Sequence, residues 1–285
     1  MPFLNYFLSG IYYLCTLMFK KYSVGILLIV FLSLTACRSE FERARQSGDP
    51  QQILTLADRY YETGQNQKAQ MLYELVISDY RGKPEAEQII YRYAYTHYNM
   101  GQYFSSAHYF KNFATTFVNS AFREEADYLA AVSHYKQSPI YRLGQESTYK
   151  TIEELQIFVN TYPQSKRVKD CNKLIDELRK KLETKAYNEA KLYFDLRQYQ
   201  AALHAFENVL IDFPDTENVE KIRYLQIKSS YLLAVNSVYS KKEERFETAM
   251  KYVELFLRKY PKSKYKKEIK NIRKDIKNNF KILNS

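Results

Sequence analysis

The stretch from residue 185 to residue 214 constrains the fold more than any other part of this sequence. Its spacing predicts two short antiparallel helices, because Ala190 and Ala202 lack bulk where two such helices would cross closely. Tyr193 and Phe206 are expected to fill the space beside those crossings, and the proline at the end of the stretch would stop the second helix. One helix pair cannot bury its own apolar face, so about three or more are expected.

Four further segments of the chain repeat this pattern, beginning near Pro50, and the pattern resembles the tetratricopeptide repeat. The chain has only seven glycines and seven prolines among 285 residues, which favours helices over the many tight turns of a β-sandwich. We therefore expect an all-α fold, an α-solenoid of about five tetratricopeptide-like helix pairs with a C-terminal capping helix. An aromatic residue stands at the end of every pair: Tyr80, Phe117, Tyr162, Phe213 and Tyr260.

Three segments depart from the simple repeat. A longer loop is expected at residues 138–144, and an unbroken helical pattern at 166–181 predicts one long helix bridging the third and fourth pairs. The first helix of the fifth pair is expected to extend over 219–239. An isoleucine stripe at 264–280, surrounded by Lys and Arg, predicts the capping helix.

The N-terminus resembles a bacterial lipoprotein signal. Lys20 and Lys21 precede an apolar run from Val24, which ends in Leu-Thr-Ala followed by Cys37. The resemblance implies that residues 1–36 are removed and that Cys37 carries a covalent lipid, the one attached group that we expect. Met18 would begin a signal of ordinary length, so we favour it as the true start; the alternative is a second apolar anchor.

The remaining domain organisation follows from the repeats. We expect a lipidated lead-in at residues 37–48, repeats one to three at 49–163, and the bridging helix, repeats four and five and the basic cap at 164–285. Cys15 falls in the removed segment and Cys37 takes the lipid, so Cys171 has no partner and a disulfide framework is not expected.

Tyrosines provide the first candidate site. In peptide-binding members of the repeat class, a concave groove is lined from fixed positions of the first helix in each pair. Tyrosine ladders suit apolar, aromatic-bearing peptides. The other interpretation of these tyrosines is ordinary core. The groove positions correspond here to Tyr61, Tyr91, Tyr95, Tyr98 and Tyr135.

Charge provides the second candidate site. Residues 258–285 hold eleven Lys or Arg against Glu268 and Asp275, a balance of +9, whereas the rest of the chain after residue 36 is formally neutral. This end is expected to meet an acidic partner domain or anionic headgroups, or else to be a solvated cap. The candidate docking residues are Arg258, Lys262, Lys264, Lys266, Lys267 and Lys270.

The lipid-attachment motif, the five repeats and endings such as Tyr-Pro-Lys-Ser at Tyr260 together resemble the BamD family of outer-membrane lipoproteins. The resemblance implies a scaffold on the periplasmic face of the outer membrane, within the β-barrel assembly machinery. It implies docking on the barrel-forming subunit and its periplasmic domains, and receipt of unfolded barrel proteins through their C-terminal segment.

Two other functions remain open from the sequence. One is a different repeat lipoprotein of the cell envelope, such as a coordinator of peptidoglycan synthesis, and the other is a lipid-anchored enzyme. No phosphate-cradling glycine loop, H-E-x-x-H or G-x-S-x-G motif occurs, so catalysis is not expected. The four histidines fall at two repeat positions in different units rather than in one place, so a metal site is not expected. A nucleic-acid partner is not expected either, because the resemblance to a lipoprotein signal implies export.

Overall fold

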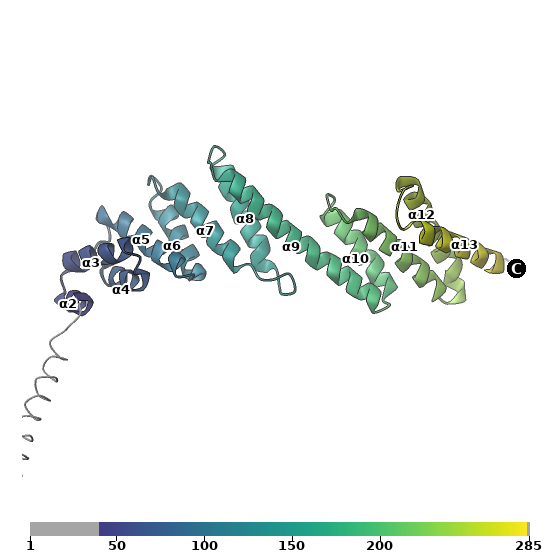
Figure 1. Cartoon of the computed structure of the whole chain (residues 1–285), viewed down its shortest axis with the longest axis horizontal. Helices are drawn as coiled ribbons and strands as arrows, with labels where there is room; N and C mark the ends of the chain where they lie inside the picture. The colour runs from purple at the N-terminus through teal and green to yellow at the C-terminus, as the bar shows by residue number, and fades with distance from the viewer. Residues whose placement is uncertain (1–39, 284–285) are drawn as a thin grey trace, which may run out of the picture. The chain divides into compact units, whose positions relative to one another are not determined.

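The computed structural model describes residues 40–283, and this part of the chain is helical throughout (Figure 1). Its twelve helices, with no strand among them, confirm the all-α fold expected from the repeats. Packing divides the chain into two compact units, one ending at Ser133 and the other beginning at His134. This boundary falls inside a helix. The boundary expected from the sequence, after residue 163, was placed by counting repeats and stays a prediction. The expected signal peptide at residues 1–36 and the expected lipid-attachment residue Cys37 lie outside the described residues.

Helix pairs joined by tight turns build the first unit. Asp49 caps α3, because its carboxylate accepts a hydrogen bond from the Gln51 amide over 2.9 Å, and Pro50 stands in the first turn. The turns after α3 and α5 pass through Gly64 and Gly101 at φ of +73° and +71°, backbone that favours glycine. The helices are α2 (Glu40–Ser47), α3 (Pro50–Glu62), α4 (Asn66–Val76), α5 (Glu85–Asn99), α6 (Tyr103–Thr116) and α7 (Arg123–Gln137), the last of which crosses the unit boundary.

A short helix, α2, occupies the segment that the sequence marks only as a lead-in. Its Phe41 packs on the first core cluster, with its ring 6.3 Å from that of Tyr60. Arg59 of α3 donates to the Glu40 carboxylate over 2.6 Å. With Ala44 as its one buried residue, α2 has too weak a periodic pattern to be recognised from the sequence.

The second unit contains the long bridging helix. α9 runs unbroken for 28 residues, which confirms that prediction. The expected loop before α8 is also present, and Lys181 of α9 holds it by donating to the Ser138 hydroxyl over 2.8 Å. Ile269, Ile272 and Ile276 of α13 are buried, which confirms the capping helix. The helices are α8 (Glu146–Thr161), α9 (Val168–Asp195), α10 (Tyr199–Asp212), α11 (Val219–Val235), α12 (Tyr239–Lys259) and α13 (Lys266–Leu283).

The small residues predicted at the helix crossing are buried there, but the tyrosine predicted beside them is not. Ala190, Ala202 and Phe206 are fully buried in a cluster shared by α9, α10 and α11. Tyr193 was expected beside them, but its side chain is 41% exposed. That prediction is wrong, because the next residue, Phe194, turns inward instead and contacts Tyr199 of α10 at 5.9 Å between ring centroids.

The first helix of the fifth pair is shorter than the sequence predicts. α11 ends at Val235, and Tyr239 begins α12 rather than ending α11. Val238 between them has extended backbone, with φ of −62° and ψ of 150°, so the chain cannot continue as one helix there. Apolar periodicity continues on both sides of this break, and periodicity alone cannot show a reversal of direction.

The second helix of four repeats ends in one shared geometry. The aromatic residue at each end has φ between −106° and −129° and ψ between 62° and 68°, and its amide donates to the carbonyl four residues back. Three of these rings pack on an aromatic residue one turn earlier in the same helix, for example Tyr260 on Phe256 at 4.8 Å. The four are Phe117, Tyr162, Phe213 and Tyr260.

A hydroxyl three residues after that aromatic joins the two helices of a pair. It accepts the amide proton two residues later, which forms a local turn. In three repeats it also donates to a glutamate of the pair's first helix. We call these three contacts the hydroxyl–glutamate clamps. They are Ser120 to Glu87 at 2.6 Å, Thr216 to Glu183 at 2.6 Å and Ser263 to Glu220 at 2.5 Å.

Candidate protein-binding sites

Three tyrosines of the predicted groove come together on α5, and Glu125 of α7 joins two of them. The hydroxyls of Tyr91 and Tyr95 donate to the two carboxylate oxygens of Glu125 over 3.0 and 2.8 Å. The Tyr95 ring lies 5.1 Å from that of Tyr91 and 6.4 Å from that of Tyr98, both edge to face. Glu125 was not identified from the sequence, because its contact with α5 depends on how α7 packs.

Tyr91 belongs to the core rather than to an open groove. Its side chain is 9% exposed, and its ring stacks on Phe122 at 4.6 Å and contacts Phe113 at 5.3 Å. Burial raises the pKa of the Tyr91 and Tyr95 hydroxyls above the ordinary tyrosine value, so both remain protonated donors to Glu125. Tyr95 and Tyr98 are half-buried and retain accessible edges.

Tyr61 and Tyr135 flank this set in different ways. Tyr61 of α3 is half-buried, and the Arg92 guanidinium lies 5.3 Å from its ring centroid while pairing with Asp58 at 2.8 Å. Tyr135 belongs to the second compact unit, where its hydroxyl donates to Glu177. That hydrogen bond, with burial, raises the pKa of Tyr135 to about 12. The structure therefore brings four of the five tyrosines into one unit, and their binding of a peptide stays a prediction.

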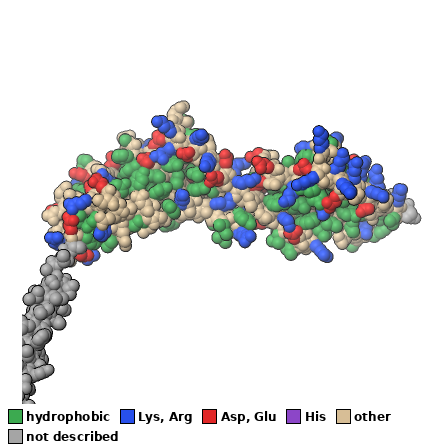
Figure 2. Space-filling model, viewed as in Figure 1, with side chains coloured by type: hydrophobic (Ala, Val, Ile, Leu, Met, Phe, Trp, Pro, Cys, Tyr) green, Lys and Arg blue, Asp and Glu red, His purple; other side chains and the backbone are tan. Residues whose placement is uncertain are grey.

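The basic residues of the second candidate site lie where α12 passes into α13. Figure 2 shows Lys and Arg side chains gathered on this end of the molecule. Within residues 40–283, none of the six predicted docking residues forms an ion pair, in contrast to the neighbouring pairs Lys228–Glu268 and Arg273–Glu254. Lys266 differs from the others, because its ammonium donates to the carbonyl of Pro261 over 2.8 Å and so stabilises the turn. The rest are exposed: Arg258, Lys262, Lys264, Lys267 and Lys270.

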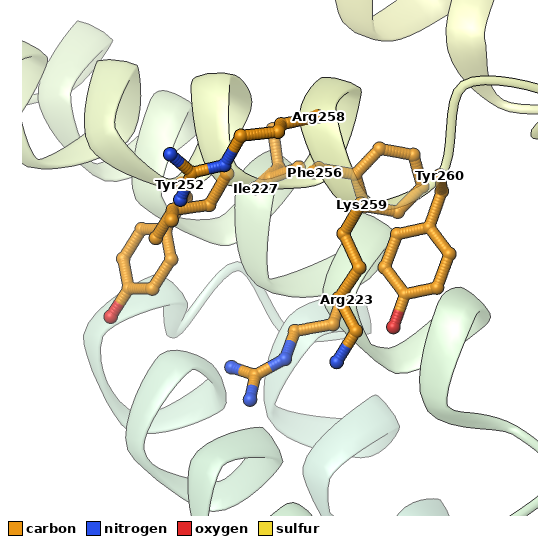
Figure 3. Close-up of a pocket in the computed structure, with 8 residues that line it drawn as sticks. Arg223, Ile227, Tyr252, Phe256, Arg258, Lys259 and Tyr260 are labelled. Atoms are coloured by element: carbon orange, nitrogen blue, oxygen red, sulfur yellow. The ribbon is translucent and has the colours of Figure 1, made fainter.

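A pocket of about 470 Å³ adjoins this basic surface, between α11 and α12 (Figure 3). Arg258, one of the candidate docking residues, lines it together with Arg223 of α11 and Lys259 of α12, and its role in docking stays a prediction. Tyr252 and Tyr260 also line it. Sequence reasoning missed these partners of Arg258. Tyr260 and Lys259 are its near neighbours in the chain and could have been included, but only tertiary packing brings Arg223 to α12.

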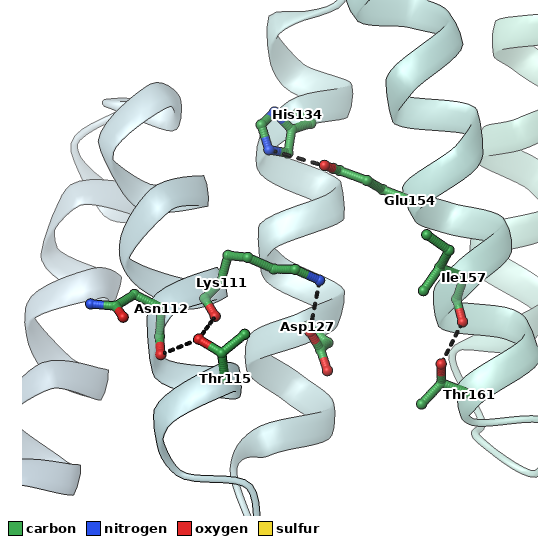
Figure 4. Close-up of polar contacts among 8 residues, drawn as sticks. All are labelled: Lys111, Asn112, Thr115, Asp127, His134, Glu154, Ile157 and Thr161. Carbon is green, nitrogen blue, oxygen red and sulfur yellow. Dashed lines mark hydrogen bonds and ion pairs between the residues drawn. The ribbon is translucent and has the colours of Figure 1, made fainter.

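The histidines lie apart in the described part of the chain, and His97 and His134 contact neighbouring helices. No group of three or more potential metal ligands occurs within residues 40–283. His97 is buried, its ring nitrogens contact Gln70 and Gln102, and burial lowers its pKa. Figure 4 shows His134 beside Glu154 at 3.4 Å in the second unit, and Lys111 beside Asp127 at 3.5 Å in the first. Each contact joins two neighbouring helices, as ordinary repeat packing requires.

The described helices define a helical-repeat protein of the tetratricopeptide kind. The chain belongs to the YfiO family, described as "Outer membrane lipoprotein", whose family model matches residues 46–244. This is the BamD-like family that the sequence motifs indicated. None of the helices between residues 40 and 283 has both the length and the apolar character needed to cross a bilayer.

Known proteins show further similarities to this chain. No match was found among curated proteins. The structure described as "TPR2AB-domain:pHSP90-complex of yeast Sti1" is 12% identical, covers 80% of this chain and 98% of its own, and has a TM-score of 0.37. Kinesin light chain TPR-like repeats from Podosopora anserina are 15% identical, cover 80% of this chain and all of their own, and have a TM-score of 0.31.

Proposed function

We propose that this chain is a lipid-anchored, non-catalytic scaffold on the periplasmic face of the outer membrane, where it takes part in assembling β-barrel proteins. The observation that carries the proposal is the outer membrane lipoprotein family match across residues 46–244, which covers the helices from α3 to α11. A repeat protein whose interior is filled by packed side chains has its outer surfaces free for partners.

The parts of the chain have separate roles in this proposal. Cys37 carries the lipid that holds the protein to the membrane. The basic surface at α12 and α13 docks on the barrel-forming subunit or its periplasmic domains, because unpaired lysines attract an acidic surface. The accessible edges of Tyr95 and Tyr98 receive the extended, aromatic-bearing end of an unfolded barrel protein.

The test is co-purification after extraction of membranes with mild detergent. An affinity-tagged chain should bring down an abundant integral barrel protein, recognised because a folded barrel shifts its gel mobility on heating. A tagged Cys37→Ala variant serves as the control for anchoring. Recovery of peptidoglycan-synthesis proteins with no barrel would contradict the proposal and favour the second envelope function.

A further inference from the structure

The pocket between α11 and α12 combines separated positive charges with an apolar base. Ile227 and Phe256, which are 1% and 3% exposed, form that base. In Figure 3 the side chains of Arg223 and Lys259 point to the same side of the pocket as the Tyr260 hydroxyl. Arg258 lies on the other side. An occupant therefore meets cations at two positions with an apolar surface between them.

The acidic groups of the surrounding helices leave these charges largely uncompensated. Glu254 of α12 pairs with Arg273 at 2.7 Å, and Glu220 of α11 accepts the Ser263 hydroxyl. Arg223 donates to the neutral side chain of Gln226 over 2.9 Å. Burial raises the pKa of the Tyr252 hydroxyl most. The negative charge of Glu207 on α10 also raises this pKa, and the positive charge of Arg223 lowers it. The pocket consequently has an excess of positive charge.

We propose that this pocket binds a short acidic segment of a partner protein, in which carboxylates flank one large apolar side chain. The inference rests on the proposed scaffold function and deepens it by naming the chemistry of a docking partner. A cavity of about 470 Å³ accommodates a single large side chain with its backbone, and Tyr252 and Tyr260 supply rigid walls for it.

The two cationic positions distinguish this occupant from a lipid. A phospholipid carries its phosphate at one end of an apolar chain, whereas a peptide can place a carboxylate on each side of an apolar residue. Guanidinium groups bind carboxylates through paired hydrogen bonds, and the apolar side chain gains by leaving water. Both ends of the segment are therefore held, which fixes its position in the pocket.

Binding of synthetic peptides to the detergent-purified full chain tests the inference. The probe is a fluorescent peptide with Asp-Phe-Asp between Gly and Ser residues, followed by anisotropy. The matched peptides carry Asn-Phe-Asn and Asp-Ala-Asp. We expect the neutral peptide and the alanine peptide each to bind at least about tenfold more weakly, since each lacks one half of the recognition.

Protein variants locate the binding. Arg223→Gln and Lys259→Gln should each lower the affinity for the acidic peptide about tenfold. Lys277→Gln on α13 removes an equal charge outside the pocket and should leave the affinity unchanged. Glu207→Gln should strengthen binding, because it removes a competing negative charge. Circular dichroism confirms that the helices persist, and the exposed Lys259 provides a variant with little risk to folding.

If the acidic peptide binds, three further outcomes would still overturn the inference. They are equal affinity for the neutral peptide, loss of binding with Lys277→Gln as great as with Arg223→Gln, and displacement of the peptide by phosphatidylglycerol vesicles, which would make this a lipid headgroup site. If the peptide does not bind but barrel proteins co-purify normally, the pocket proposal is refuted and the scaffold function is retained. If the peptide binds but no barrel protein co-purifies, the proposed scaffold function is refuted and the binding chemistry of the pocket is retained.

Discussion

The hydroxyl of Thr216 donates a hydrogen bond of 2.6 Å to Glu183, 33 positions earlier in the chain, and so joins the end of α10 to the first helix of its own pair. Glu183 is 7% exposed and also receives Lys180 at 3.0 Å and the Asn218 amide at 3.3 Å. Burial by itself would raise the pKa of this carboxyl, but these three donors lower it below its usual value. The carboxylate is therefore ionised and held in place, which makes the Thr216–Glu183 clamp a structural feature of the fourth repeat.

Removing the Thr216 hydroxyl should destabilise the second unit. Thr216→Val leaves a buried carboxylate short of one donor, and we expect a loss of about 1 to 3 kcal/mol in the free energy of unfolding. Thr216→Ser keeps the hydroxyl and provides the matched control. Urea unfolding followed by circular dichroism measures both variants. Equal stability of Thr216→Val and the unchanged protein would show that the clamp contributes nothing.

The same clamp predicts a dependence of stability on pH. The pKa of Glu183 is lower in the folded state than in the unfolded chain, so its contribution is fully present above the unfolded value of about 4.3 and is lost as pH falls through the folded value. Glu183→Gln should therefore flatten the acid limb of the curve of stability against pH. An acid limb that is unchanged in this variant would contradict the assignment.

The turn after α9 should be strained, in contrast to the turns after α3 and α5. Arg197 has φ of +61° at the position where Gly64 and Gly101 stand in other repeats, and its side chain is exposed. We expect Arg197→Gly to stabilise the protein by about 0.5 kcal/mol and Gly101→Ala to destabilise it by about 1 kcal/mol. Thermal unfolding of both variants tests this, and a stabilising Gly101→Ala would refute it. A Cβ at Gly101 meets no atom within 4 Å, so backbone strain is the quantity measured.

The tyrosines of α5 should separate into one core residue and one surface residue. Tyr91→Ala removes a buried ring stacked on Phe122, and we expect it to cost about 3 kcal/mol in stability. Tyr98→Ala should cost much less and should weaken binding of an extended, aromatic-bearing peptide by about tenfold. Calorimetry and fluorescence anisotropy measure the two effects. Normal peptide binding by Tyr98→Ala would remove the groove assignment from α5.

The membrane anchor should depend on one thiol. Cys37→Ala should release the protein from membranes, because the covalent lipid contributes about 0.8 kcal/mol for each buried methylene. No helix described between residues 40 and 283 could take over the anchoring by spanning the bilayer. Detergent phase partition measures this. A variant that is processed normally and stays in the detergent phase would exclude lipid attachment at Cys37.

Docking through the basic surface should be sensitive to salt. Replacing Lys262, Lys264, Lys267 and Lys270 by Glu should weaken association with the partner, while Lys266 is left intact because it stabilises the turn at Pro261. The helical content should not change, since the four side chains are exposed. Co-purification at low and at moderate salt measures the effect. Equal recovery of the charge-reversed protein under both conditions would assign these lysines to a solvated cap.

Local pattern in the sequence determined much of this structure. Ala190 and Ala202 marked a close helix crossing because only small side chains allow it, and the isoleucine stripe of α13 marked a cap because its period is helical. The lipid-attachment motif and the repeat endings also indicated the family, and the match over residues 46–244 confirms it. These signals are all short patterns in the sequence, and each one indicates a physical requirement directly.

Tertiary structure decided which residues meet from different helices. Glu125 accepts hydrogen bonds from Tyr91 and Tyr95, and Glu183 accepts one from Thr216. Arg223 and Arg258 line one pocket although they lie on different helices. Their spacing follows no short period, because it depends on loop length and on the angle at which helices pack. For the same reason the sequence left open whether Tyr91 was groove or core, and only the rings packed around it determined that it is core.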